Sequence, residues 1–128
     1  MVVGCGLGAD TEYTARLGFD TTGFDISATA IRLAGQRFPH TTVHYQVADL
    51  LALPAGWRHA FGLVVEIITA QALPDPPRRQ AIENIAGLVA TEGTLLVLAA
   101  VHDPTCRSAR FRPGRYGKTR STHSPPTA

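Results

Sequence analysis

Cysteine, tryptophan, methionine and long apolar runs are scarce in this chain of 128 residues, which has two Cys, one Trp and one Met. No uninterrupted apolar run approaches the roughly 20 residues that a membrane helix needs. The N-terminus also lacks a basic segment followed by an apolar one, so we expect neither a membrane protein nor a secreted one. The two cysteines form neither a disulfide framework nor a metal-binding pattern, and the five His show no ligand spacing. We therefore expect one cytoplasmic domain with free thiols and no metal.

Acidic residues are absent from the C-terminal end of the chain. Residues 1–106 hold all ten acidic and six of the twelve basic residues, a formal charge of −4, whereas residues 107–128 hold the other six basic residues, a charge of +6. This end has no apolar periodicity and is rich in Pro, Gly, Ser and Thr, so it cannot bury enough surface to offset its ordering entropy. We expect a folded domain over residues 1–103 and a basic, disordered tail over residues 104–128. Because the tail has two aromatic residues and no recognisable motif, we do not expect a nucleic-acid partner.

Strand-like and helix-like segments alternate up to residue 100. Apolar, β-branched or aromatic runs predict five strands, over residues 1–3, 21–25, 42–47, 61–66 and 94–100. Helical spacing of apolar residues predicts helices between the first and second, the second and third, and the fourth and fifth of these strands. Strands joined by right-handed helical crossovers form a parallel sheet, so we expect an α/β, Rossmann-like fold with flanking helices.

Glycine, proline and capping residues predict where these helices begin and end. The first helix opens at Asp10, has Tyr13 and Leu17 on one face, and stops at Gly18. The second is capped by Ser27 and carries Ile31, Ala34 and Phe38 at helical spacing until Pro39 ends it. For the third, Asp75 and Pro76 are expected at the cap and in the first turn. The apolar stripe of this helix is predicted to consist of Ala81, Ile82, Ile85, Ala86 and Val89. Glu92–Gly93 is predicted to form the turn before the last strand.

Candidate binding residues follow the strands directly. In open parallel sheets, ligands bind beyond the carboxyl ends of the strands. The first strand runs into the turn Gly4-Cys5-Gly6-Leu7-Gly8, which lets a ligand approach the backbone and leads into a helix N-terminus that favours an anionic group. Asp25 follows at about the interval at which Rossmann-type folds place an acid on a ribose. Asp49 and Glu66 follow the third strand and end the fourth.

The glycine turn and Asp25 alone would also fit a nicotinamide dinucleotide site. The GxGxG spacing completed by Gly8, together with Asp49 and Glu66, favours a single nucleoside, whose ribose is held by one acid and whose adenine edge is held by the next. The segments VVGCGLGADTEYTARLGFDTTGFDIS, VADLLALP and FGLVVEIITAQALP resemble class I S-adenosylmethionine-dependent methyltransferases. They are most similar to the group around thiopurine S-methyltransferase, over roughly residues 2 to 103.

This resemblance assigns a role to the glycine turn. Gly4, Gly6 and Gly8 would pass under the methionine portion of S-adenosyl-L-methionine. Many family members carry an acid two residues before the first glycine, where this chain has Val2, so that contact to the cofactor is missing or is made by Asp10. Cys5 could have its pKa lowered by the helix N-terminus, but a small turn residue is the preferred interpretation.

The resemblance also implies roles for the residues after the later strands. Asp25 would accept both ribose hydroxyls, with Ile26 against the adenine. Asp49 would accept a hydrogen bond from the adenine amino group, with Leu50 packed on the ring. Glu66 would face the sulfonium and the acceptor, where it orients the substrate or the amino group of the cofactor. An acid at a strand end is more often simply solvated, and this alternative stays open.

The resemblance therefore implies methyl transfer from S-adenosyl-L-methionine to a small-molecule acceptor. Because positioning an acceptor beside a sulfonium supplies most of the catalysis, we expect no obligatory acid or base. The family has a further segment before the first strand and continues past the fifth, so we expect a chain truncated at both ends, with an uncovered fifth strand and a possible partner subunit that completes the fold. Two alternatives remain: a non-catalytic remnant that still binds the cofactor, and a nicotinamide dinucleotide-binding module.

Overall fold

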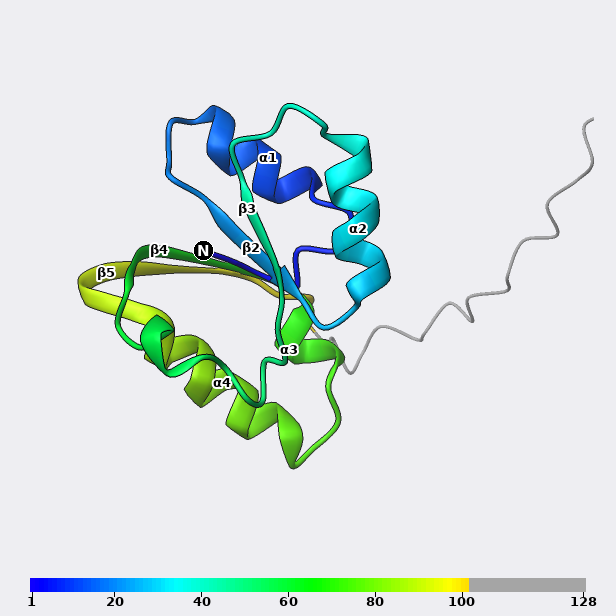
Figure 1. Cartoon of the computed structure of the whole chain (residues 1–128). Helices are drawn as coiled ribbons and strands as arrows, with labels where there is room; N and C mark the ends of the chain where they lie inside the picture. The colour runs from blue at the N-terminus through cyan, green and yellow to red at the C-terminus, as the bar shows by residue number, and fades with distance from the viewer. Residues whose placement is uncertain (102–128) are drawn as a thin grey trace, which may run out of the picture.

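A computed structural model describes residues 1–101 as alternating strands and helices (Figure 1). The elements are β1 (Val2–Val3), α1 (Ala9–Arg16), β2 (Thr22–Asp25), α2 (Ala28–Arg37), β3 (His44–Val47), the short 3₁₀ helix η1 (Ala55–Trp57), β4 (Phe61–Ile67), α3 (Thr69–Ala72), α4 (Pro77–Leu88) and β5 (Val89–Leu98). The expected basic tail over residues 104–128 lies outside the described residues. None of the helices in the described part is long and apolar enough to cross a membrane.

The five strands form one parallel sheet in the order β3-β2-β1-β4-β5. Val2 is in register with Gly23 of β2 on one side and with Val65 of β4 on the other. The strand order reverses at β1, and α1 and α2 cover one face of the sheet while α4 covers the other (Figure 1). The predicted Rossmann-like α/β fold is confirmed, and its switch point lies at the glycine turn that follows β1.

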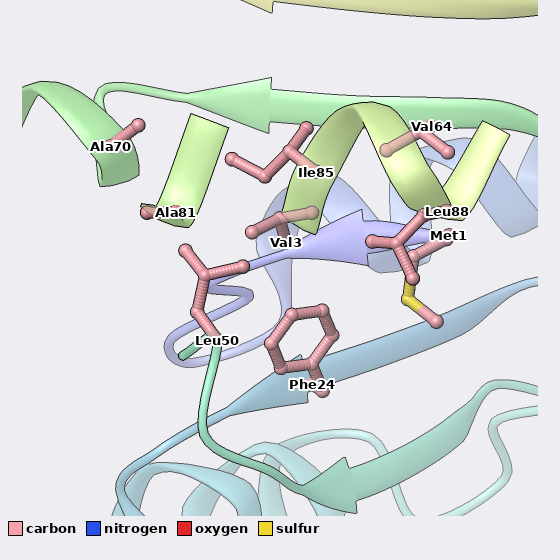
Figure 2. Packing of buried hydrophobic residues seen from close by; sticks show 9 residues of the cluster. All are labelled: Met1, Val3, Phe24, Leu50, Val64, Ala70, Ala81, Ile85 and Leu88. Carbon is pink, nitrogen blue, oxygen red and sulfur yellow. The ribbon is translucent and has the colours of Figure 1, made fainter. Parts of the chain in front are cut away.

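The core is largest between the sheet and α4 (Figure 2). Phe24, only 1% exposed, belongs to this core and packs against Trp57, with 5.3 Å between the ring centroids and 50° between the ring planes. A smaller cluster under α1 and α2 contains Val2, Cys5 and Val65. The buried members on the α4 side are Met1, Val3, Phe24, Leu50, Val64, Ala70, Ala81, Ile85 and Leu88.

The predicted Ser27 cap and Gly18 stop are confirmed, but α1 begins at Ala9, one residue before the predicted Asp10, because Gly8 in its left-handed conformation takes the cap position. The Ser27 hydroxyl accepts a hydrogen bond from the amide of Ala30 at 3.2 Å and caps α2, which ends one residue before Phe38. Gly18 has the left-handed φ of +95° and follows the last turn of α1. The helix predicted before the fifth strand is α4. It begins at Pro77 with Pro76 as its cap, so the prediction of Asp75 as the cap is wrong by one residue. The cap position has no side-chain hydrogen bond here, and Pro77 occupies the first turn, where its missing N–H costs nothing.

Two of the predicted apolar faces are less buried than their spacing suggests. In α4, Ala81 and Ile85 are buried, but Ile82 is 53% exposed and Ala86 is also exposed. These two residues lie over β5, where the described sheet ends and no further element covers them. In α1, Tyr13 is 58% exposed, and the buried face is formed instead by small or polar residues, namely Thr11, Glu12 and Thr14.

The fifth strand starts earlier than predicted. β5 spans Val89–Leu98, and its register with β4 jumps from the pair Phe61–Val89 to the pair Leu63–Thr94. The expected turn at Glu92–Gly93 is therefore an irregularity within the strand, with a positive φ of 59° at Glu92. Within residues 1–101, β5 is an edge strand whose apolar residues 95–98 are exposed, as expected.

Candidate functional site

Gly4, Asp25, Ile26, Asp49 and Leu50, which were predicted for cofactor binding, meet at the carboxyl ends of β1, β2 and β3, beside α3. A cavity of about 230 Å³ opens there. This volume is below the range of about 300–1,000 Å³ that is usual for a complete ligand pocket. It is lined by Gly4, Phe24, Asp25, Ile26, Ala48, Asp49, Leu50, Leu51, Thr69 and Leu73. Five of the nine predicted site residues belong to this lining.

The three glycines of the turn have different surroundings. All have left-handed backbone conformations, with φ of +61° at Gly4, +52° at Gly6 and +85° at Gly8. A Cβ atom on Gly4 would lie 2.5 Å from the Thr69 hydroxyl, and one on Gly8 would overlap the Tyr45 hydroxyl. A Cβ atom on Gly6 would meet nothing within 4 Å. Gly4 and Gly8 therefore allow close internal packing, and Gly6 is the position at which the backbone is open to a ligand.

Asp25 connects the end of β2 to the glycine turn. Its Oδ2 accepts a hydrogen bond from the amide of Gly6 at 3.0 Å, and its Oδ1 accepts one from the amide of Ser27 at 2.8 Å. Each carboxylate oxygen thus holds one backbone N–H. A carboxylate offers about four acceptor sites, so about two remain for a further donor group.

The third strand contributes a second acid and part of the apolar wall. Oδ1 of Asp49 accepts a hydrogen bond from the amide of Leu51 at 2.8 Å, while the residue itself is exposed. Ile26, which is 69% exposed, and the buried Leu50 supply apolar surface to the same cavity. A polar edge beside two aliphatic side chains suits a flat heteroaromatic ring that carries an amino group.

Glu66 lies apart from this cavity. Its side chain is on the α4 side of the sheet and only 4% exposed, so the alternative of a solvated strand-end acid is wrong. Glu66 is kept away from solvent by α3, because Oε1 of Glu66 accepts a hydrogen bond from the amide of Ala70 at 2.9 Å. Glu66 also lines a second, mainly apolar cavity of about 360 Å³ between α4 and β5.

Neither Asp10 nor Cys5 lines this cavity. Asp10 is exposed in the first turn of α1, outside the residues that line the cavity. Burial, followed by the negative charge of Asp25, raises the pKa of the Cys5 thiol to about 11. The thiol therefore stays protonated near neutral pH, which agrees with the interpretation of Cys5 as a small turn residue. Across residues 1–101 the structure shows no cluster of three His, Cys, Asp or Glu that could hold a metal ion.

The sequence did not predict the lining residues Phe24, Ala48, Leu51, Thr69 and Leu73, and Thr69 is the one among them with a hydroxyl group. It opens α3, lines the cavity and fills the space beside Gly4, while its hydroxyl donates towards the Val3 and Ile67 carbonyls at 3.3 Å. The missing side chain of Gly4 is the one sequence signal for such a neighbour. Nothing in the spacing of the motifs indicates which residue that neighbour is.

Several solved structures resemble this chain. The PH0226 protein from Pyrococcus horikoshii OT3 superposes with a TM-score of 0.69 at 21% identity, covering 75% of this chain and 46% of that protein. The N-methyltransferase NodS from Bradyrhizobium japonicum WM9, solved with S-adenosyl-L-homocysteine, gives 0.65 at 28% identity, covering 75% and 49%. A TehB-like SAM-dependent methyltransferase from Corynebacterium glutamicum gives 0.63 at 26% identity, covering 75% and 52%. This chain thus spans about half the length of these proteins.

No curated protein matches this sequence. The family model described as a methyltransferase domain matches residues 1–93. That match covers most of the chain and includes β1 to β4, the glycine turn and both acids of the cavity. The chain therefore belongs to the methyltransferase domain family.

Proposed function

We propose that this chain binds S-adenosyl-L-methionine at the cavity beyond β1, β2 and β3 and serves methyl transfer to a small-molecule acceptor. The observation that carries the proposal is the double contact of Asp25, which holds Gly6 on one oxygen and Ser27 on the other. This arrangement fixes an acid and an open stretch of backbone side by side at the switch point of the sheet. Membership of the methyltransferase domain family supports the same function.

The residues present fit the polar parts of this cofactor. The acceptor sites that remain on Asp25 suit the two neighbouring hydroxyls of a ribose. The free Oδ2 of Asp49 suits an adenine amino donor, and Ile26 with Leu50 supplies apolar contact for the ring. Gly6, with no atom near its missing Cβ, leaves room for the methionine portion beside the backbone. NodS, which was solved with S-adenosyl-L-homocysteine, supports the assignment of this ligand class.

The chemistry asks for positioning more than for proton transfer. When bound, S-adenosyl-L-methionine supplies a sulfonium methyl group that is already electrophilic, so holding an acceptor in line provides most of the rate. In this protein Asp25 and Asp49 would orient the nucleoside, and Gly6 would leave room for the methionine portion of the cofactor, which carries the methyl group. Glu66 holds the N-terminus of α3, so we assign it to positioning α3. We further propose residues 1–103 as the cofactor-binding unit and residues 104–128 as a separate basic tail.

A thermal melt of the full chain with S-adenosyl-L-homocysteine or with NAD tests this function. A ligand that binds the folded state alone, at ~100 times its dissociation constant, adds about 2.7 kcal/mol of stability. We expect the midpoint to rise with S-adenosyl-L-homocysteine and to stay unchanged with NAD. A rise with NAD alone would identify a dinucleotide module, and indifference to both ligands would identify a remnant without cofactor binding.

A further inference from the structure

Tyr45 packs against the glycine turn from the face of the sheet opposite to α4. It lies on β3, where its side chain joins the small cluster of Val2, Cys5 and Val65 under α1 and α2. Its hydroxyl occupies the space that a Cβ atom of Gly8 would need, and a Cβ atom there would also lie 3.0 Å from Cζ of Tyr45. Gly8 is therefore in direct contact with an aromatic side chain from a strand 37 positions away.

Glu12 holds the Tyr45 hydroxyl in this position. Glu12 belongs to α1 and is 8% exposed, and its carboxyl group accepts a hydrogen bond from the Tyr45 hydroxyl at 2.8 Å. The Thr41 hydroxyl donates to the same oxygen, and its own oxygen accepts a hydrogen bond from the amide of Val43 at 2.9 Å. A buried acid with two hydroxyl donors thus joins α1 to the segment that enters β3.

The single proton of the Tyr45 hydroxyl is directed to Glu12. The distance to the Gly8 carbonyl oxygen is 3.4 Å, compared with 2.8 Å to Glu12, so the carboxyl group is the main acceptor. Burial, followed by the hydrogen bond to Glu12, raises the pKa of Tyr45, so the hydroxyl remains protonated and available as the donor. The oxygen of Tyr45 is fixed by this bond at the point where it contacts Gly8.

The glycine turn is consequently held at both ends. Asp25 holds the amide of Gly6 at 3.0 Å on the cavity side, and the amide of Gly8 closes the turn on the Cys5 carbonyl at 2.9 Å. We propose that Tyr45, fixed by Glu12, is a positioning residue that holds Gly8 in its left-handed conformation and so sets the shape of the cofactor-binding turn. The effect on cofactor affinity rests on the function proposed above, whereas the effect on the turn itself does not.

The substitution Tyr45→Phe tests this role, with Tyr13→Phe as the matched control. Both remove one phenolic oxygen, but Tyr13 is exposed on the outer face of α1. A hydrogen bond to a charged group contributes enough that we expect Tyr45→Phe to weaken S-adenosyl-L-homocysteine binding about tenfold, and Tyr13→Phe to leave it unchanged. Glu12→Gln, which keeps an acceptor oxygen, should give a smaller loss of about threefold. Isothermal titration calorimetry measures all three affinities.

Hydrogen exchange provides a readout that needs no ligand. In Tyr45→Phe, the amides of residues 5–12 should exchange several-fold faster while those of α4 keep their rate, because α4 lies on the other face of the sheet. Equal acceleration in both segments would mean general destabilisation and would overturn the positioning role. Unchanged exchange in residues 5–12 would overturn it as well. If the unsubstituted protein binds no S-adenosyl-L-homocysteine, the proposed function fails, and exchange still decides the role of Tyr45.

A double substitution tests the contact between Tyr45 and Gly8. Gly8→Ala introduces a Cβ atom that overlaps the Tyr45 hydroxyl, and it also strains a backbone with φ of +85°. The backbone strain is the same in either background, but the overlap with oxygen disappears when residue 45 is Phe. We therefore expect Gly8→Ala to accelerate exchange in residues 5–12 less in the Tyr45→Phe background than alone. Strictly additive effects would show that the two residues are independent.

Discussion

Exchanging one acid of the cavity for its amide should separate the structural role of Asp25 from its binding role. In Asp25→Asn, the single carbonyl oxygen can serve either Gly6 or Ser27, and the new NH₂ group must face the other backbone N–H. The Gly6 contact is partly buried and the Ser27 contact is exposed, so we expect the oxygen to keep Gly6 and leave Ser27 to water. Loss of stability should therefore lie at the low end for an unpaired donor, ~1 kcal/mol.

The expected effects of Asp25→Asn are measurable by urea denaturation and by calorimetry. With a slope of about 2 kcal/mol per M for a small domain, ~1 kcal/mol lowers the urea midpoint by roughly 0.5 M. Binding should suffer more, because the ribose hydroxyls lose a charged acceptor. Hydrogen bonds to charged groups contribute about 1.5–3 kcal/mol, which corresponds to a loss of roughly 10- to 150-fold in affinity for S-adenosyl-L-homocysteine.

Asp49→Asn is the matched control for this experiment. Asp49 uses one carboxylate oxygen, for the amide of Leu51, so the amide side chain can keep that bond with its own oxygen. We expect the free energy of unfolding to stay within about 0.5 kcal/mol. Affinity should still fall about tenfold, because an NH₂ group would face the adenine amino donor. An equal drop of the urea midpoint in both variants, or unchanged affinity in Asp25→Asn, would refute the roles derived from these contacts.

Three further predictions concern the turn, its thiol and the core. Gly4→Ala should destabilise the fold more than Gly6→Ala in urea denaturation, because only the Cβ atom of Gly4 meets Thr69, whereas Gly6→Ala should mainly reduce affinity for S-adenosyl-L-homocysteine. The pKa of Cys5 in the folded protein is about 11, above its ordinary value of 9.0, so the folded state favours the protonated thiol. Stability should therefore fall as the pH rises from about 9 to 11, because the folded state resists ionisation of the thiol. Cys5→Ala lacks this thiol and should show a smaller fall in the urea midpoint over the same pH range. Phe24→Ala should cost about 3–5 kcal/mol by removing a buried ring, and an almost unchanged melting temperature would contradict the core described here.

Most of the fold follows from local signals in the sequence. The alternation of apolar runs with helical spacing predicts the parallel sheet, and Ser27 and Gly18 predict helix ends at the positions where the structure has them. The exposure of Ile82 in α4 could not be predicted in this way. Helical spacing shows that a residue shares a face with buried neighbours, but it does not show how far the sheet beneath that face extends.

In the cofactor site, contacts between residues close in the chain could be predicted from the sequence, and contacts between residues far apart could not. Asp25 and Gly6 are 19 positions apart, within the interval that a strand, a turn and a helix impose, so a motif predicts their meeting. Thr69 reaches β1 across 66 positions, and Tyr45 reaches Gly8 across 37. Those two contacts depend on which strands become neighbours and on which residue of each lies level with the turn. Glycine at positions 4 and 8 indicates that another side chain packs closely there, and only the assembled sheet shows that these side chains are Thr69 and Tyr45.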